Sequence, residues 1–122
     1  MGHLSPTEEY GERSVDFAVQ CRPRLVVGSR VNIRSDDGRR AARTALCLRD
    51  AGRTIELASA RDNGDGGPTL FQLAAELLAE GCEEALNLDG GPSTAWASVN
   101  DHGTVFIPPV APVRHAIVVR RR

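Results

Sequence analysis

The stretch PTLFQLAAELLAEGCEEALNLDGGPST, residues 68–94, holds the strongest helix and strand signals of this sequence. Pro68 suits the first position of a helix, and Gly81 suits the position just past its C-terminal end. Between them, apolar residues recur at the i, i+3, i+4, i+7, i+8 spacing of one buried helix face, at Leu70, Leu73, Ala74, Leu77 and Leu78. Residues 84–88 then predict a strand directly after the helix.

Short apolar or alternating runs, bounded by turn residues, predict further strands. They lie at residues 15–20, 24–27, 30–33, 42–49, 53–60, 94–99, 104–107 and 115–120. Strands 53–60 and 84–88 flank the helix, so we expect them to run parallel in a right-handed crossover. The sequence therefore predicts an α+β fold, a mixed and mostly antiparallel sheet with one main amphipathic helix (about 68–80) packed on it.

Length and composition fit one globular domain of 122 residues, 41% hydrophobic and 25% charged. We interpret the polar residues 1–13 as a leader or severed linker and residues 14–122 as the domain. The net charge of −1 gives no case for a nucleic-acid or membrane partner. The N-terminal residues show no signal peptide, so the chain as it stands reads as cytoplasmic, and it would be exported if a longer N-terminus carried the signal.

The three cysteines, Cys21, Cys47 and Cys82, stand at unrelated spacings. They form no Cys-x-x-Cys pair and have no histidine close enough to suggest a zinc site. We therefore expect buried free thiols. No cofactor and no metal-ligating residue is predicted, although a divalent metal is not excluded. All 15 basic residues are arginine, so an anion site in this chain must use guanidinium groups.

The segment that follows the helix is the best candidate for a functional site. Asp89 stands at the carboxyl end of its strand, where ligand sites of strand–helix–strand units collect. The backbone N–H groups of Gly90-Gly91 can form an anion-binding concavity, to which Ser93 and Thr94 add hydroxyl donors. The alternative is a tight turn in which Asp89 caps its own backbone.

Residues 84–94 resemble the Asn-Leu-Asp-Gly-Gly-x-Ser signature of the phosphodiester glycosidases. That family includes the lysosomal enzyme that removes N-acetylglucosamine from mannose-6-phosphate diesters, and many bacterial relatives. Residues 19–26 resemble its Gln-x-x-Pro-x-Leu-Val block, residues 43–47 its Arg-Thr-Ala-x-Gly strand, and residues 67–82 the helix before the signature. The blocks occur in the family's order, and the resemblance spans about Val15 to Val119.

The resemblance implies a role for each matching residue. Arg43 would bind the phosphate, and Asp89 would act as the acid–base or cation-stabilising carboxylate. Substrate-binding positions would be the polar and glycine residues of the same blocks, namely Gln20, Thr44, Asn87, Gly90, Gly91, Ser93 and Thr94. Asp62 or Asp65, in the polar loop before the helix, could supply a second carboxylate. The alternative for Arg43 is a surface or interdomain salt bridge.

The sequence also departs from the family. It shows no counterpart of the family's N-terminal half, Cys47 stands where glycine is usual, and His115 stands where the family tends to have asparagine. Uncovered sheet edge and apolar surface would then favour a homodimer or association with the missing half. Two functions stay open. One is a glycosidase that hydrolyses or transfers a sugar from a sugar-1-phosphodiester, and the other is a catalytically incomplete module that binds a sugar phosphate or a partner chain.

Overall fold

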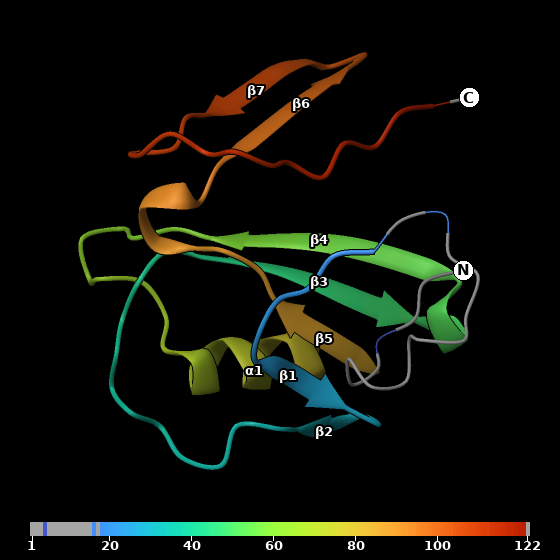
Figure 1. The fold of residues 1–122 in the computed structure, drawn as a ribbon, viewed down its shortest axis with the longest axis vertical. Helices are drawn as coiled ribbons and strands as arrows, with labels where there is room; N and C mark the ends of the chain where they lie inside the picture. The colour runs from blue at the N-terminus through green and yellow to red at the C-terminus, as the bar shows by residue number, and fades with distance from the viewer. Residues whose placement is uncertain (1–3, 5–15, 17, 122) are drawn as a thin grey trace.

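The computed structural model describes residues 4, 16 and 18–121, and it shows one main sheet, one helix and a separate hairpin (Figure 1). The main sheet has the strand order β2-β1-β5-β3-β4, and every hydrogen-bonded pair in it is antiparallel. The elements are β1 (Arg24–Val27), β2 (Arg30–Val31), β3 (Arg43–Arg49), β4 (Thr54–Ala60), α1 (Leu70–Ala79), β5 (Glu84–Asn87), β6 (Trp96–Asn100) and β7 (Gly103–Ile107). The predicted α+β class, with a mostly antiparallel sheet and one helix, is confirmed.

Helix α1 begins at Leu70, two residues later than Pro68, because Thr69 supplies the N-cap. The Thr69 hydroxyl accepts a hydrogen bond from the backbone N–H of Gln72, and the Gln72 side chain accepts one from the N–H of Thr69. The predicted C-terminal glycine is confirmed: Gly81 has a φ of 93° and donates to the Leu78 carbonyl, while Cys82 donates to that of Leu77.

The crossover around α1 has the predicted strand directions, but its two strands are not neighbours. Both β4 and β5 run antiparallel to β3, so they are parallel to each other with β3 between them. The register places Ala45 of β3 opposite Ala58 of β4 on one side and opposite Asn87 of β5 on the other. The start of β3 therefore lies beside the end of β5.

The core lies between α1 and one face of the sheet, as Figure 1 shows for β1 and β5. It consists of small and medium-sized side chains from the helix and from three strands: Leu25, Val26, Ala45, Cys47, Leu73, Ala74, Leu77, Cys82 and Ala85. Along the sheet, α1 lies nearest to β1 and β2.

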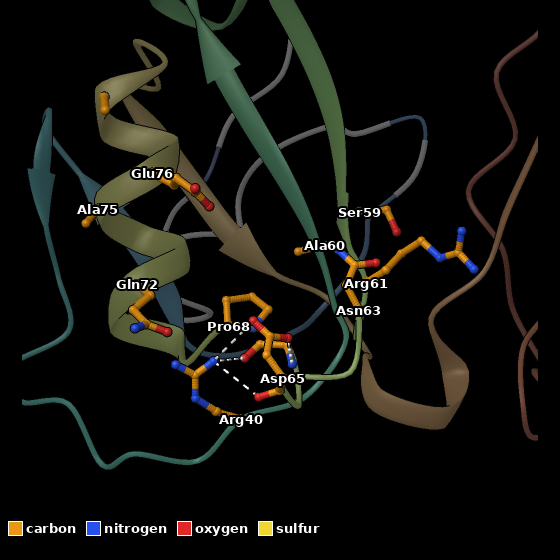
Figure 2. A pocket seen from close by; sticks show the side chains of 12 residues that line it. Arg40, Ser59, Ala60, Arg61, Asn63, Asp65, Pro68, Gln72, Ala75 and Glu76 are labelled. Carbon is orange, nitrogen blue, oxygen red and sulfur yellow. Dashed lines mark hydrogen bonds and ion pairs between the residues drawn. The ribbon is translucent and has the colours of Figure 1, made fainter.

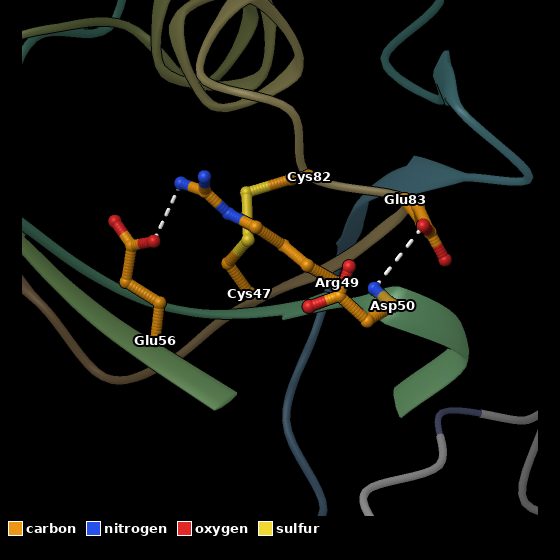
Figure 3. The surroundings of a disulfide bond; sticks show 6 residues. All are labelled: Cys47, Arg49, Asp50, Glu56, Cys82 and Glu83. Atoms are coloured by element: carbon orange, nitrogen blue, oxygen red, sulfur yellow. Dashed lines mark hydrogen bonds and ion pairs between the residues drawn. A yellow bond between two sulfur atoms is a disulfide. The ribbon is translucent and has the colours of Figure 1, made fainter. Parts of the chain in front are cut away.

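The expectation of free thiols is wrong for two of the three cysteines. Cys47 and Cys82 form a disulfide with a Cα–Cα distance of 5.6 Å (Figure 3). Cys21 is free. The bond links β3 to the segment that enters β5, inside the core. No local pattern predicts it, because the two residues are 35 positions apart and meet only through the β3–β5 register.

Four predicted strands differ from the structure, and the one predicted at 30–33 is shortened to β2 (Arg30–Val31). Residues 115–120 form no strand, and neither do residues 18–20, while residues 15 and 17 lie outside the described part. The strand predicted at 94–99 begins only at Trp96, because Gly91–Ser93 form a 3₁₀ turn before it. A strand-like sequence forms a strand only where a partner supplies hydrogen bonds, and no described strand pairs with these segments.

Hairpin β6–β7 lies apart from the main sheet (Figure 1). Its apolar side chains are largely solvent-exposed, with Val99 at 81% and Phe106 at 66%. A two-stranded hairpin is marginal in water on its own. The prediction that uncovered apolar surface favours association stays a prediction. In the described part of the chain, no helix has the length and apolar character to cross a membrane.

Candidate functional site

The carboxyl end of β5 lies between the amino ends of β1 and β3, because β5 is antiparallel to both. Backbone hydrogen bonds continue this pairing past the last strand residues. The N–H of Asn87 donates to the Pro23 carbonyl at 3.0 Å, that of Leu88 to Thr44 at 2.8 Å, and that of Gly91 to Ala42 at 2.6 Å. Three chain segments that are distant in sequence thus meet at one edge of the sheet.

A solvent-open hollow of about 460 Å³ lies at this edge, and we call it the Asp89 hollow. It is lined by Cys21, Arg22, Ala41, Arg43, Asn87, Leu88, Asp89, Gly90 and Gly91. Both predicted catalytic residues, Arg43 and Asp89, are among them, together with three of the predicted substrate-binding residues. Arg22 and Cys21 were not predicted, because only the β1–β5 pairing shows that they lie beside the end of β5.

Gly90 and Gly91 are required here for different reasons. A Cβ atom on Gly90 would lie 2.9 Å from the Ala42 carbonyl oxygen, so only glycine allows the turn to approach β3 this closely. Gly91 has open space around it but a φ of 57°, in the region that glycine favours. The sequence GG thus permits the turn to pack against the start of β3.

The N–H groups of this turn already have partners inside the chain. Gly91 donates to the Ala42 carbonyl, and Gly90 donates to Oδ1 of Asp89 at 3.0 Å. The Gly91 bond belongs to the β3–β5 pairing, whereas the Gly90 bond involves an exposed carboxylate. Asp89 therefore caps its own turn in this structure, and an anionic ligand would have to replace Asp89 as the acceptor for the Gly90 N–H.

The Arg43 guanidinium is half-buried and held by two backbone carbonyls. Its Nε donates to the Pro68 carbonyl at 3.3 Å and its Nη2 to the Arg39 carbonyl at 2.7 Å. These bonds fix the group at the rim of the hollow and leave further N–H donors of its five unused. Arg43 makes no ion pair with any described residue, so its alternative role in a salt bridge is not seen there.

Asn87 joins the hollow to the segment before β1. Its Nδ2 donates to the Arg22 carbonyl at 3.0 Å, whereas its Oδ1 is buried without a hydrogen-bond partner. A buried acceptor without a partner costs about 1–3 kcal/mol. A hydroxyl or N–H donor of a ligand in the hollow could satisfy this oxygen.

Four predicted substrate-binding residues do not line the hollow. Thr44 follows Arg43 on β3, so its side chain points to the opposite face of the sheet, where its Oγ1 lies 3.5 Å from that of the buried Thr94. Ser93 belongs to the 3₁₀ turn that leads away from the site, and Gln20 is an exposed residue before Cys21.

Asp62 and Asp65, the candidate second carboxylates, organise the loop before α1. Asp62 accepts from the N–H groups of Gly64 and Gly66, each at 2.8 Å. Asp65 accepts from Gly67 and lies 3.6 Å from Nη1 of Arg40 (Figure 2). The Gly67 hydrogen bond, assisted by the charge of Arg40, lowers the pKa of Asp65. Asp65 lines a separate hollow of about 890 Å³, which reaches from the end of β4 to α1.

The described residues contain no group of three or more His, Cys, Asp or Glu side chains that could hold a metal ion. His115, which stands where the family tends to have asparagine, is exposed and does not line the Asp89 hollow. The charged and amide residues that line the hollow are therefore two arginines, one aspartate and one asparagine, grouped around a glycine turn. Such a set can bind an anion and place a carboxylate beside it.

Two of three comparisons with known proteins found a match. The model of the phosphodiester glycosidase family matches residues 3–120. A solved structure, that of a hypothetical protein from Synechocystis, is 32% identical with a TM-score of 0.50 over 61% of this chain, which corresponds to 15% of that protein's chain. No protein with a curated description matches. Because the family model matches almost from end to end, this chain belongs to the phosphodiester glycosidase family.

Proposed function

We propose that this chain cleaves the bond between a sugar and the phosphate of a sugar-1-phosphodiester, with N-acetylglucosamine as the sugar. The observation that carries the proposal is the position of Arg43 and Asp89 in one hollow at the end of β5. Family membership supports the reaction class. The choice of N-acetylglucosamine as the sugar rests only on the resemblance to the lysosomal enzyme.

In the proposed reaction, the bond between the anomeric carbon and the phosphate oxygen breaks, and its electron pair stays on that oxygen, which leaves as part of the phosphomonoester. Arg43 neutralises the charge on the departing phosphate oxygens, because its guanidinium is already held in place by the Pro68 and Arg39 carbonyls. The anomeric carbon passes through an oxocarbenium-like transition state. Asp89 stabilises that cation or accepts a proton from the water that attacks it, and the products are the free sugar and a phosphomonoester.

One observation favours the second function, binding without turnover. Glycosidases generally use two carboxyl groups, and among the described residues only Asp89 contributes a carboxylate to the hollow. In addition, the stretch matched in the Synechocystis protein is 15% of that protein's chain. In this alternative, the chain is a catalytically incomplete module that binds a sugar phosphate without cleaving it.

The test is the release of N-acetylglucosamine from its methyl 1-phosphodiester by wild type, Asp89→Asn and Asp101→Asn. Asp101 is an exposed aspartate in the β6–β7 turn, far along the chain from the hollow, and serves as the matched control. We expect turnover by wild type and by Asp101→Asn, and a loss of at least a hundredfold in Asp89→Asn. Undiminished turnover in folded Asp89→Asn would refute the assignment of Asp89. Saturable binding with no turnover in wild type would select the second function.

A further inference from the structure

We propose that Arg22 is a second phosphate-binding residue of the Asp89 hollow, opposite Arg43. This inference rests on the proposed function, since it assumes that a phosphodiester occupies this hollow. Arg22 lines the hollow, is exposed, and belongs to none of the positions that the family resemblance assigned. In the Gln-x-x-Pro block it falls on a position that the resemblance leaves unspecified.

The backbone of Arg22 is fixed to β5. Its carbonyl accepts the hydrogen bond from Nδ2 of Asn87 at 3.0 Å, and the carbonyl of the next residue, Pro23, accepts from the N–H of Asn87. Asn87 is the last residue of β5 and stands two residues before Asp89. The Cα of Arg22 is therefore held beside the end of β5, and only the side chain is left to move.

The guanidinium of Arg22 has no partner among the described residues. The ion pairs there involve Arg39, Arg40 and Arg49, and Arg43 is bound by backbone carbonyls. An exposed arginine without a partner is common on protein surfaces. What distinguishes Arg22 is its place, on the β1 side of Asp89, with Arg43 on the β3 side.

The charges of the lining support an anionic ligand. The two arginines and one aspartate among the lining residues sum to one net positive charge, which a phosphodiester monoanion would neutralise. Arginine binds phosphate oxygens through two parallel N–H groups, so arginines on both sides of β5 could hold the two non-bridging oxygens. Asp89, between them, would then face the sugar end of the same ligand.

The experiment compares wild type, Arg22→Gln, Arg22→Lys and Arg24→Gln with the same methyl phosphodiester. Arg24 lies two residues later, on β1, and does not line the hollow, so Arg24→Gln is the matched control. For Arg22→Gln we expect KM to rise about tenfold with kcat within twofold, because a charge-assisted contact made in the bound state is lost. The kcat/KM of Arg22→Gln should also depend less on salt concentration than that of wild type. Arg22→Lys should recover part of the lost affinity, and Arg24→Gln should have the KM of wild type.

The outcomes separate this inference from the proposed function. If wild type turns over and Arg22→Gln has an unchanged KM, the role of Arg22 is refuted while the proposed function stands. If wild type shows no turnover, the affinity of the diester is measured by calorimetry instead. An affinity about tenfold weaker in Arg22→Gln than in wild type supports the role of Arg22 even though no cleavage is seen. Binding that is absent, or equal in Arg22→Gln and wild type, overturns it. Thermal unfolding followed by circular dichroism confirms that each variant is folded.

Discussion

Removal of the Cys47–Cys82 disulfide should destabilise this fold strongly. The bond closes a loop of 35 residues that contains β4 and α1 and joins β3 to the segment entering β5. The loop-entropy relation gives about 4 kcal/mol for a loop of this length. A domain of this size has a total stability of about 5–15 kcal/mol, so the bond accounts for a large share of it. We expect the double variant Cys47→Ala/Cys82→Ala to unfold roughly 10–20 °C below wild type.

The assay is thermal and urea unfolding followed by far-ultraviolet circular dichroism, for oxidised wild type, wild type with a phosphine reductant, and the double variant. Cys21→Ala is the matched control, because Cys21 is free. Its melting temperature should lie close to that of wild type, and reductant should lower both equally. A shift below about 2 °C on reduction of wild type, with the thiols shown by titration to be free, would refute the loop-entropy argument.

Two further changes test the turn at the site and the loop before the helix. Gly90→Ala should destabilise the fold by about 1–3 kcal/mol in urea unfolding, because its Cβ would lie 2.9 Å from the Ala42 carbonyl oxygen; unchanged stability would show that the β5–β3 approach is loose. Asp65 has a lowered pKa in the folded chain, so its contribution to stability is present above its unfolded pKa near 3.8 and is lost as the pH falls through the folded value. Melting temperatures of wild type and Asp65→Asn should therefore differ at pH 6 and converge toward pH 2, and a constant difference would contradict this.

The sequence predicted well where one chain segment carries the whole signal. The α1 stripe and Gly81 lie within a few residues of each other, and they place the helix to within two residues. Asp89, Gly90 and Gly91 are likewise consecutive in the sequence, and all three line the hollow. The helix start moved from Pro68 because the Thr69–Gln72 capping box competes with the preference for proline at the first position.

Features that depend on strand pairing could not be predicted from local pattern. The disulfide requires β3 to lie beside β5, and the position of Arg22 requires β1 to lie on the other side of β5. One error could have been avoided. Thr44 follows Arg43 directly, and neighbours on a strand point to opposite faces, so both side chains could not enter one hollow.

The insertion of β3 between β4 and β5 is what creates the candidate site. If β4 and β5 were direct neighbours in a simple parallel crossover, the strand beside Asp89 would be β4, whose end at this edge carries Ala60. With β3 between them and antiparallel to both, the amino end of β3 lies beside Asp89 and brings Arg43 to the carboxylate's side. The disulfide from Cys47 to Cys82 holds these same two strands together. Stability of the fold and placement of Arg43, the proposed phosphate-binding residue, therefore depend on one pairing, and a variant that loosens it should lose both.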